Sequence, residues 1–326
     1  MSDDLTGPPQ PPLPAPPPIQ PPTFVQPPPS AVPAPTGADA WPWYFGLLAL
    51  VAGLFGAFFV IAVLSGIWAA GGGDINGPTF TVIATAAQAV VFVVTVFAIA
   101  RSRGPVSFRD FGLVRAPFWP TVGKMVATIL SYFVLLAIWN ALVHLAPDNA
   151  PDKLGANTGT LGMLGFAVLV AVLAPISEEI FFRGMVFRAF ANGAGVWAGA
   201  FFSGLLFGSL HIDSLSHDRL LQVVPLALLG MMFALLYAWS GTIYSTIALH
   251  ATNNSLAVLI YANDHDSSFG VVLAIVLWVL MMLGCALGWR LTDNGADAPA
   301  APQPPAPPAR YPPPGPENPD FPWGQP

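Results

Sequence analysis

Charged residues are scarce in this chain of 326 residues: they make up 9% of it, whereas 54% of the residues are hydrophobic. Soluble domains carry roughly 25% charged residues, so this composition excludes an ordinary soluble fold. The single cysteine, Cys285, excludes a scaffold of intramolecular disulfides. With 11 basic against 17 acidic residues and no dense basic cluster, the chain also lacks the charge that nucleic-acid binding requires, so no nucleic-acid partner is expected.

Proline is concentrated near the two ends of the chain. Residues 1–40 hold 15 of the 37 prolines, and residues 294–326 hold 13. Such segments have too little apolar surface to offset the entropy of ordering, so both are expected to be disordered tails. Their proline runs favour polyproline II, so a proline-motif-binding protein is a candidate partner, but solvated tails with no specific partner are the preferred interpretation.

Between the tails, residues 41–293 consist largely of long apolar runs. This pattern predicts an all-α, polytopic membrane helical bundle that has the lipid bilayer as its surroundings. We expect about eight transmembrane helices, at Trp43–Ala69, Phe80–Ala100, Val122–His144, Leu161–Ala191, Val196–His211, Leu221–Trp239, Ile243–Tyr261 and Phe269–Trp289. The fourth contains Pro175, which removes a backbone donor and is expected to kink the helix.

The few basic residues predict the orientation of the bundle. They concentrate at residues 101–124, between the second and third expected spans, toward the end of the fourth span, and after the eighth. The positive-inside rule places these ends in the cytoplasm. With an even number of spans, both termini of this multi-pass protein are then expected to be cytoplasmic.

Ionisable side chains occur inside the fourth expected span, where they are expensive and usually mark a site or a structural pair. Glu179 and Arg183 are four residues apart, share a helix face and can form an ion pair. Glu178 points about 100° away from Glu179 and is left without this partner. An unpaired carboxylate at this depth suits general-base chemistry.

The same spacing of four residues recurs on two later spans, as Phe207 with His211 and as His250 with Asn254. Taken singly, a polar residue in a membrane helix is explained equally well as a hydrogen bond between helices. Together with Glu178, however, these residues supply what amide hydrolysis needs. They offer a base for water, a second proton carrier and donors for an oxyanion.

Three motifs in this order on successive apolar segments resemble those of the CPBP family of intramembrane proteases. The motifs are Glu178-Glu179-x-x-x-Arg183, Phe207-x-x-x-His211 and His250-x-x-x-Asn254. The family includes the Rce1-type CAAX prenyl endopeptidases and bacterial proteins associated with bacteriocin self-immunity. The resemblance covers a protease core at about residues 120–262, and it implies a bacterial plasma membrane as the location. It also implies a site that is reached from the cytoplasmic side, which the spacing of the residues leaves open.

The resemblance also implies roles for the motif residues. Glu178 would activate the attacking water with His211, while His250 and Asn254 would stabilise the oxyanion. The Glu179–Arg183 pair and Phe207 would support the site. The implied activity is that of a membrane-embedded endopeptidase acting on membrane-associated proteins or peptides, with prenylated chains as one candidate class.

Metal dependence is a separate question that the residues leave open. Glu178, His211 and His250 would make a Glu-His-His set like that of a catalytic zinc site. Against zinc, the sequence has no His-Glu-x-x-His run. We therefore prefer a glutamate-activated water with no metal cofactor and keep zinc as the alternative.

Two other classes of function fit some of these features. A non-proteolytic membrane scaffold or self-immunity factor would keep the polar residues as structural hydrogen bonds and recruit partners through its tails. A small transporter would use Glu178 and the histidines as a proton relay. The transporter predicts inverted repeats, and the sequence has none that we can see.

Overall fold

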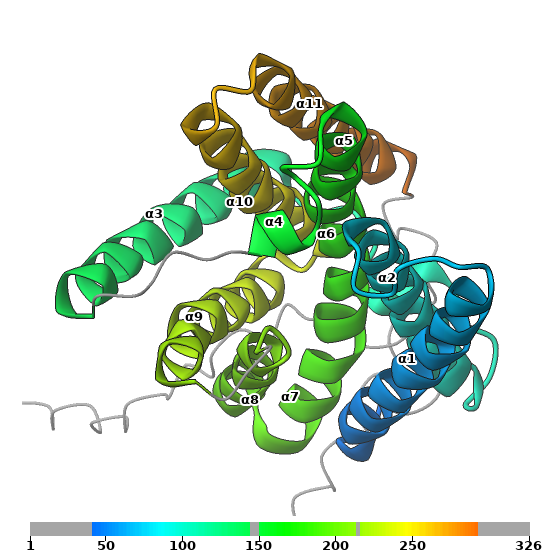
Figure 1. Ribbon diagram of the computed structural model, residues 1–326. Coiled ribbons are helices and arrows are strands. Elements are labelled where there is room, and N and C mark those ends of the chain that lie inside the picture. The colour runs from blue at the N-terminus through cyan, green and yellow to red at the C-terminus, as the bar shows by residue number, and fades with distance from the viewer. Residues whose placement is uncertain (1–40, 144–149, 213–215, 293–326) are drawn as a thin grey trace, which may run out of the picture.

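The computed structural model describes residues 41–143, 150–212 and 216–292, and every regular element in these ranges is a helix (Figure 1). Both proline-rich tails lie outside the described residues, so their expected disorder remains a prediction. The elements are α1 (Tyr44–Ala70), α2 (Pro78–Arg101), η1 (Phe108–Phe111), α3 (Phe118–Leu142), α4 (Ala150–Lys153), α5 (Thr160–Val168), η2 (Leu169–Leu173), α6 (Ala174–Glu178), η3 (Glu179–Phe187), α7 (Arg188–Ala194), α8 (Val196–Ser209), α9 (His217–Ser240), α10 (Ile243–Asp264) and α11 (Ser268–Leu291).

The all-α prediction is confirmed, and each expected span falls on a helix, but eight full spans is only approximate. In the described ranges, six helical segments are long and apolar enough to cross a membrane. Among the other two, α8 has 14 residues, about 21 Å at 1.5 Å per residue, which is shorter than a hydrocarbon core of about 30 Å. The other, α10, is 22 residues long but carries polar side chains, among them Thr246, His250 and Asn254.

The expected fourth span is a continuous helical rod, Thr160–Ala194, built from α5, η2, α6, η3 and α7. Pro175 lacks a backbone N–H and lies inside this rod, at the start of α6 and directly after the π-helical element η2. The elements on either side of α6, η2 and η3, are π-helical. Such wider turns are rare and often occur at functional sites, and here they flank Glu178. The rod therefore remains helical through the proline.

Helices α8 and α9 pack with their backbones in close contact. A Cβ atom added to Gly204 would lie 2.5 Å from the Met231 amide nitrogen, and one added to Gly208 would lie 2.6 Å from the Ala227 nitrogen. Gly204 and Gly208 are four residues apart, the small-residue spacing that allows membrane helices to approach closely. This contact places Phe207, which lies between the two glycines, against the interior of the bundle, where it is 1% exposed.

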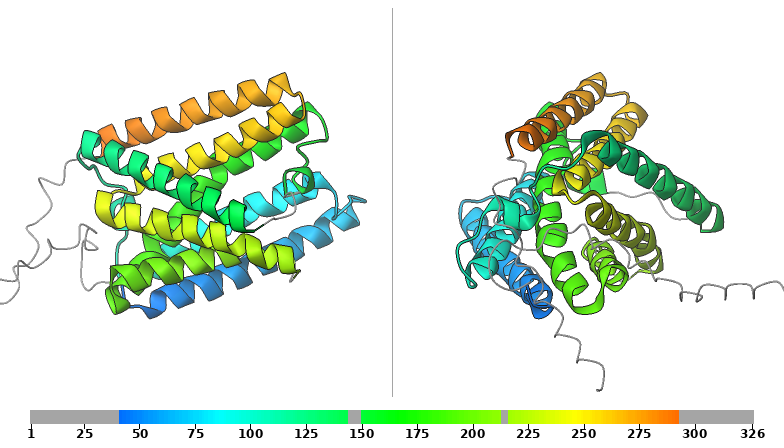
Figure 2. Two further views of the ribbon diagram at one scale, coloured as in Figure 1. Left: turned by 90° about the vertical axis from the view of Figure 1, so that its left-hand side faces the viewer. Right: turned by 180° about the vertical axis from the view of Figure 1, so that it is seen from behind.

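The two ends of the bundle differ in charge. In Figure 2 (left), α1 begins and α11 ends at the same end of the molecule. Basic side chains gather there: Arg103 donates to the Tyr44 hydroxyl (3.2 Å), Lys124 donates to the Trp239 carbonyl, and Arg115 lies 4.4 Å from the centre of the Trp289 ring. We call this the basic end. The opposite, acidic end carries Asp74, Asp152, Asp264 and Asp266. The cytoplasmic placement of the basic end remains a prediction.

The connection between α2 and α3, residues 102–117, crosses the basic end and contains η1 as its helical turn, and we call it the cap segment. Phe111 is fully buried and packs against the Trp41 and Phe97 rings. The backbone carbonyls of the cap accept hydrogen bonds from four donors, which belong to α7, to α11, and to α10 and its N-cap residue. The donors are Arg188 to Asp110 O, Ile243 N to Gly112 O (2.9 Å), Thr242 Oγ1 to Val114 O (2.6 Å) and Trp289 Nε1 to Ala116 O (2.8 Å).

The close contact between α8 and α9 predicts that Gly204 cannot carry a side chain. We expect Gly204→Ala to lower the free energy of unfolding by about 1–3 kcal/mol, because the added methyl group overpacks against the α9 backbone. Gly284→Ala on α11 is the matched control, since an added Cβ there has no neighbour within 4 Å. Thermal unfolding in detergent measures both variants, and equal stabilities would contradict this account of the packing.

Candidate active site

A carboxylate, a guanidinium and an imidazole form a buried network at the centre of the bundle. Arg183 Nη1 donates to Glu179 Oε1 at 2.9 Å, and His250 Nδ1 lies 2.8 Å from the same oxygen. Glu179 and Arg183 are fully buried, and His250 is 3% exposed. The ion pair expected from the spacing of four residues is therefore present. Its connection to α10 through His250 is a feature that the spacing did not predict.

Aromatic rings and a backbone carbonyl surround the buried guanidinium. Arg183 Nη2 donates to the Gly230 carbonyl on α9 at 2.9 Å. The guanidinium carbon lies 4.9 Å from the centre of the Phe207 ring and 5.2 Å from that of Phe233. Each ring can attract the cation through its π face. Arg183 therefore links the rod to α8 and α9 as well as to Glu179.

Glu178 lies beside this network with its carboxylate directed at His250. Its Oε2 atom is 3.9 Å from His250 Nε2, which is longer than a direct hydrogen bond and short enough for one bridging water. Within the described residues, Oε2 is buried and has no hydrogen-bond partner. The side chain as a whole is 21% exposed, whereas that of Glu179 is fully buried. Glu178 is thus the carboxylate of the pair that solvent can reach.

The contact with Glu179 fixes how His250 can act. A carboxylate accepts hydrogen bonds, so Nδ1 carries the proton of the 2.8 Å contact. This leaves Nε2 as the nitrogen that faces Glu178. The Phe233 ring, 5.3 Å from the imidazole, packs against it and holds its position. The working atom of His250 is therefore Nε2.

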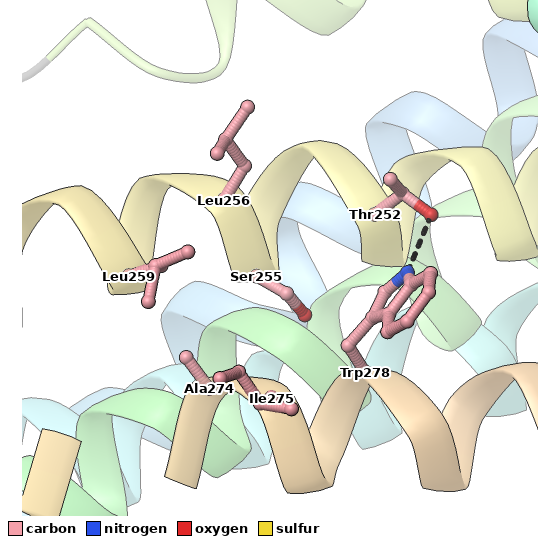
Figure 3. Close-up of a pocket in the computed structure, with 7 residues that line it drawn as sticks. All are labelled: Thr252, Ser255, Leu256, Leu259, Ala274, Ile275 and Trp278. Carbon is pink, nitrogen blue, oxygen red and sulfur yellow. Dashed lines mark hydrogen bonds between the residues drawn. The ribbon is translucent and has the colours of Figure 1, made fainter. Parts of the chain in front are cut away.

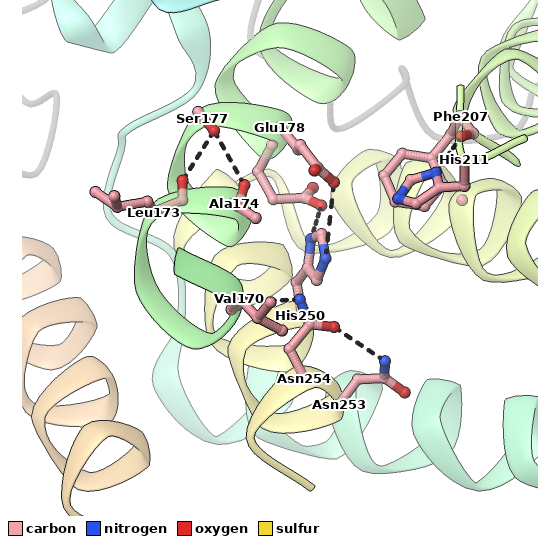
Figure 4. A network of polar contacts seen from close by, with 12 residues as sticks. Val170, Leu173, Ala174, Ser177, Glu178, Phe207, His211, His250, Asn253 and Asn254 are labelled. Carbon is pink, nitrogen blue, oxygen red and sulfur yellow. Dashed lines mark hydrogen bonds and ion pairs between the residues drawn. The ribbon is translucent and has the colours of Figure 1, made fainter. Parts of the chain in front are cut away.

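His211 lies off to one side of this network, beside Phe207 (Figure 4). The α8 helix ends at Ser209, and His211 follows in a turn, so the expected span to His211 is two residues too long. His211 Nδ1 donates to the Phe207 carbonyl at 2.8 Å, which leaves Nε2 free. His211 is exposed. In the part of the chain that the structure describes, no hydrogen bond or ion pair joins it to Glu178.

Asn254 lies one turn beyond His250 on α10. Its Nδ2 atom donates to the Val170 carbonyl at 2.8 Å, and its Oδ1 atom accepts from Asn253 at 3.2 Å. An amide nitrogen carries two N–H groups, so one remains for another acceptor. Val170 belongs to the π-helical element η2, whose distorted backbone presents this carbonyl to α10.

The proposed zinc ligands do not converge in this arrangement. Glu178 and His250 lie close together, but across residues 41–143, 150–212 and 216–292 no three His, Cys, Asp or Glu side chains form a group that could hold a metal ion. His211, the third candidate, lies beside Phe207 and forms no hydrogen bond or ion pair with Glu178 or His250 among the described residues. The free Nε2 atoms and the carboxylate have the right chemistry for zinc, but their positions do not fit a shared ion.

A separate cavity of about 200 Å³ lies between α10 and α11 (Figure 3). Thr252, Ser255 and Trp278 line it with Leu256, Leu259, Ala274 and Ile275, and Trp278 Nε1 donates to Thr252 Oγ1 at 3.0 Å. By helical geometry, Thr252 and Ser255 point away from the face that carries His250 and Asn254. The cavity therefore contributes no titratable side chain to the site.

Sequence reasoning missed the partners that other elements supply. Phe233 and the Gly230 carbonyl come from α9, and the Val170 carbonyl comes from the rod. Backbone carbonyls have no sequence signal. Phe233 is one of 23 phenylalanines in an apolar chain, so nothing in the sequence distinguishes it.

The buried network predicts a large cost for removing its cation. We expect Arg183→Met to lower the free energy of unfolding by about 3–5 kcal/mol, because Glu179 would remain buried and uncompensated. Arg290→Met, at an exposed position on α11, serves as the control and should change stability by at most about 0.5 kcal/mol. Unfolding of both variants in detergent tests this, and a similar stability for the two would refute the role given to the network.

Comparison with known proteins matches the same part of the chain. Residues 160–256 match the family described as type II CAAX prenyl endopeptidase Rce1-like. An uncharacterized 24.3 kDa protein of Escherichia coli is 26% identical over 140 residues, which cover 42% of this chain and 61% of that protein. No solved structure matches the chain significantly. The segment that carries the three motifs therefore belongs to the Rce1-like family, as its resemblance to the CPBP proteases predicts.

Proposed function

We propose that this protein is an intramembrane endopeptidase that hydrolyses peptide bonds of membrane-associated proteins or peptides. One observation carries the proposal: the buried Glu178 Oε2 atom, which has no hydrogen-bond partner among the described residues, lies 3.9 Å from His250 Nε2, and the Glu178 side chain as a whole is 21% exposed. A water that bridges these two atoms from one side would contact both a base and an oriented imidazole. Family membership of residues 160–256 supports the same class of reaction.

In this mechanism Glu178 accepts a proton from water while the water oxygen bonds to the carbonyl carbon of the substrate. The negative charge moves to the carbonyl oxygen, where the second N–H of Asn254 can donate to it, as can His250 Nε2 when the imidazole is doubly protonated. Glu178 then returns its proton to the leaving nitrogen, and the C–N bond breaks. His211, with Nε2 free and exposed, exchanges protons with solvent.

Glu179 and Arg183 act on this reaction through His250. Because Glu179 engages Nδ1, the imidazole ring is held with Nε2 toward Glu178. Phe207 supports the arrangement from α8, since its ring contacts Arg183, His211 and His250. These residues position the reacting groups and do not touch the substrate.

The substrates and surroundings are part of the proposal. Prenylated chains are one candidate class, as the description of the family suggests. We place the protein in a bacterial plasma membrane. A proline-motif-binding protein is a candidate partner for the proline-rich tails, which lie outside the described residues.

Replacing the base tests the function directly. We expect Glu178→Gln to reduce cleavage by about 100-fold or more, because the amide cannot accept the proton from water. Terminal-peptide mass spectrometry would compare cells that express the native chain with cells that express equal amounts of the variant. Asp264→Asn, which removes an exposed carboxylate at the acidic end, is the control and should leave the fragments unchanged. Identical profiles for native and Glu178→Gln chains would favour the scaffold or self-immunity role instead.

The glutamate mechanism also predicts independence from zinc. We expect cleavage by the purified protein to persist in the presence of a strong chelator, because the three candidate ligands do not converge on one point. Elemental analysis of the same sample gives the metal content. About one zinc per chain, lost together with activity and restored by adding zinc, would establish the metal-assisted alternative.

A further inference from the structure

Burial around the candidate site decreases from the basic end toward the acidic end on three elements. On the rod, residues 179–189 are all buried, whereas Glu178 is not. On α9, residues 233–238 are all buried, whereas none of residues 220–228 is. On α10, residues 245–251 are all buried, whereas 252–254 are not. In each case the continuous buried stretch is the one nearer the cap segment. Toward the acidic end, buried positions alternate with less buried ones, as at Ser255, Val258 and Ala262 of α10.

The cap segment and the side chains beneath it fill the route from the basic end. Phe111 packs on the backbone of the rod, since a Cβ added to Gly184 would lie 3.1 Å from its ring. Tyr237 of α9 is fully buried and approaches so closely that Gly112 has no room for a side chain. Phe187, also fully buried, lies against the Tyr237 ring. Arg188 is nine residues, roughly 13 Å, from Glu179, and this whole interval is buried.

The turn that holds His211 lies on the side of the site away from the cap segment. It lies inside the hydrocarbon layer of the membrane. Helix α8 starts directly after the rod ends near the basic end, and it rises only about 21 Å before the turn at residues 210–212. Non-helical backbone inside the hydrocarbon layer is tolerated only where protein buries it or where it lines a water-filled space. His211 is exposed, so protein does not bury it. The space next to His211 is therefore hydrated.

We propose that water and substrate reach Glu178 from the acidic end of the bundle, through a hydrated recess that includes His211. The cap segment closes the opposite approach. Where the positive-inside rule holds, the recess opens on the extracytoplasmic face of the membrane. This inference rests on the proposed function and narrows its substrates. They are peptide chains whose cleaved segment is presented at the extracytoplasmic side, in contrast to prenylated chain ends presented from the cytoplasm.

Single-cysteine labelling tests the access route without any need for activity. In a Cys285→Ala background, cysteines would be placed one at a time by four substitutions: Ser102→Cys in the exposed cap segment, Ser268→Cys at the exposed start of α11, His211→Cys in the recess and Ser203→Cys at a fully buried position. A membrane-impermeant sulfonated maleimide would be applied to right-side-out and to inverted vesicles that contain the full chain. The Ser102→Cys and Ser268→Cys variants report the two faces, and the Ser203→Cys variant should react from neither.

We expect the His211→Cys and Ser268→Cys variants to react in right-side-out vesicles. The Ser102→Cys variant should react in inverted vesicles. Reaction of His211→Cys from the Ser102 side, or from neither side, would overturn the proposed route. Labelling of Ser102→Cys in right-side-out vesicles would overturn the extracytoplasmic opening.

Cleavage products separate this inference from the proposed function. Among fragments that depend on Glu178, the new termini should map to extracytoplasmic, membrane-proximal segments of their parent proteins. Glu178-dependent termini on the cytoplasmic side would refute the access route and leave the protease activity established. If no fragments depend on Glu178, the proposed function fails, whereas the labelling result still decides how the recess opens.

Discussion

The Glu179 carboxylate is the group on which the rest of the site depends, because a single oxygen of it binds both Arg183 and His250. A charge in the interior of a membrane protein is costly unless another charge and hydrogen bonds compensate it. Arg183 supplies the charge from one turn along the rod, and His250 supplies a second donor from α10. The carboxylate thus fixes how the rod and α10 pack against each other, and it sets the orientation of the imidazole.

The adjacent carboxylate can be reactive because its neighbour takes the structural role. Arg183 is shared among Glu179, the Gly230 carbonyl and two phenylalanine rings, and none of these contacts involves Glu178. Two consecutive glutamates on a helix point in different directions, so one can be fully buried while the other is 21% exposed. Of these two adjacent glutamates, Glu179 therefore stabilises the structure and Glu178 remains for the reaction. The different directions of their side chains on the helix account for this division.

The sequence predicted the parts of the structure that depend on local spacing. The Glu179–Arg183 pair follows from a separation of four residues, and the helical segments follow from apolar runs. The end of α8 at Ser209 was not predictable from the sequence. Leu210 and Ile212 continue the apolar composition of the helix that precedes them. The contact between His250 and Glu179 joins residues 71 positions apart, and it depends on how α10 packs on the rod. The Gly204–Gly208 spacing is a further signal in the sequence, because small residues four apart favour close packing of membrane helices.

The position of the cap segment in the chain has a consequence for biosynthesis. Residues 102–117 are made early, whereas their hydrogen-bond donors at Arg188, Thr242, Ile243 and Trp289 are made later. At about 5–20 residues per second, a ribosome needs roughly 10–35 s to pass from the end of the cap to the end of α11. During that interval the cap carbonyls lack some of their hydrogen-bond donors, so the basic end of the nascent bundle is incompletely covered. The last helix to be made, α11, supplies the final donor, Trp289 Nε1.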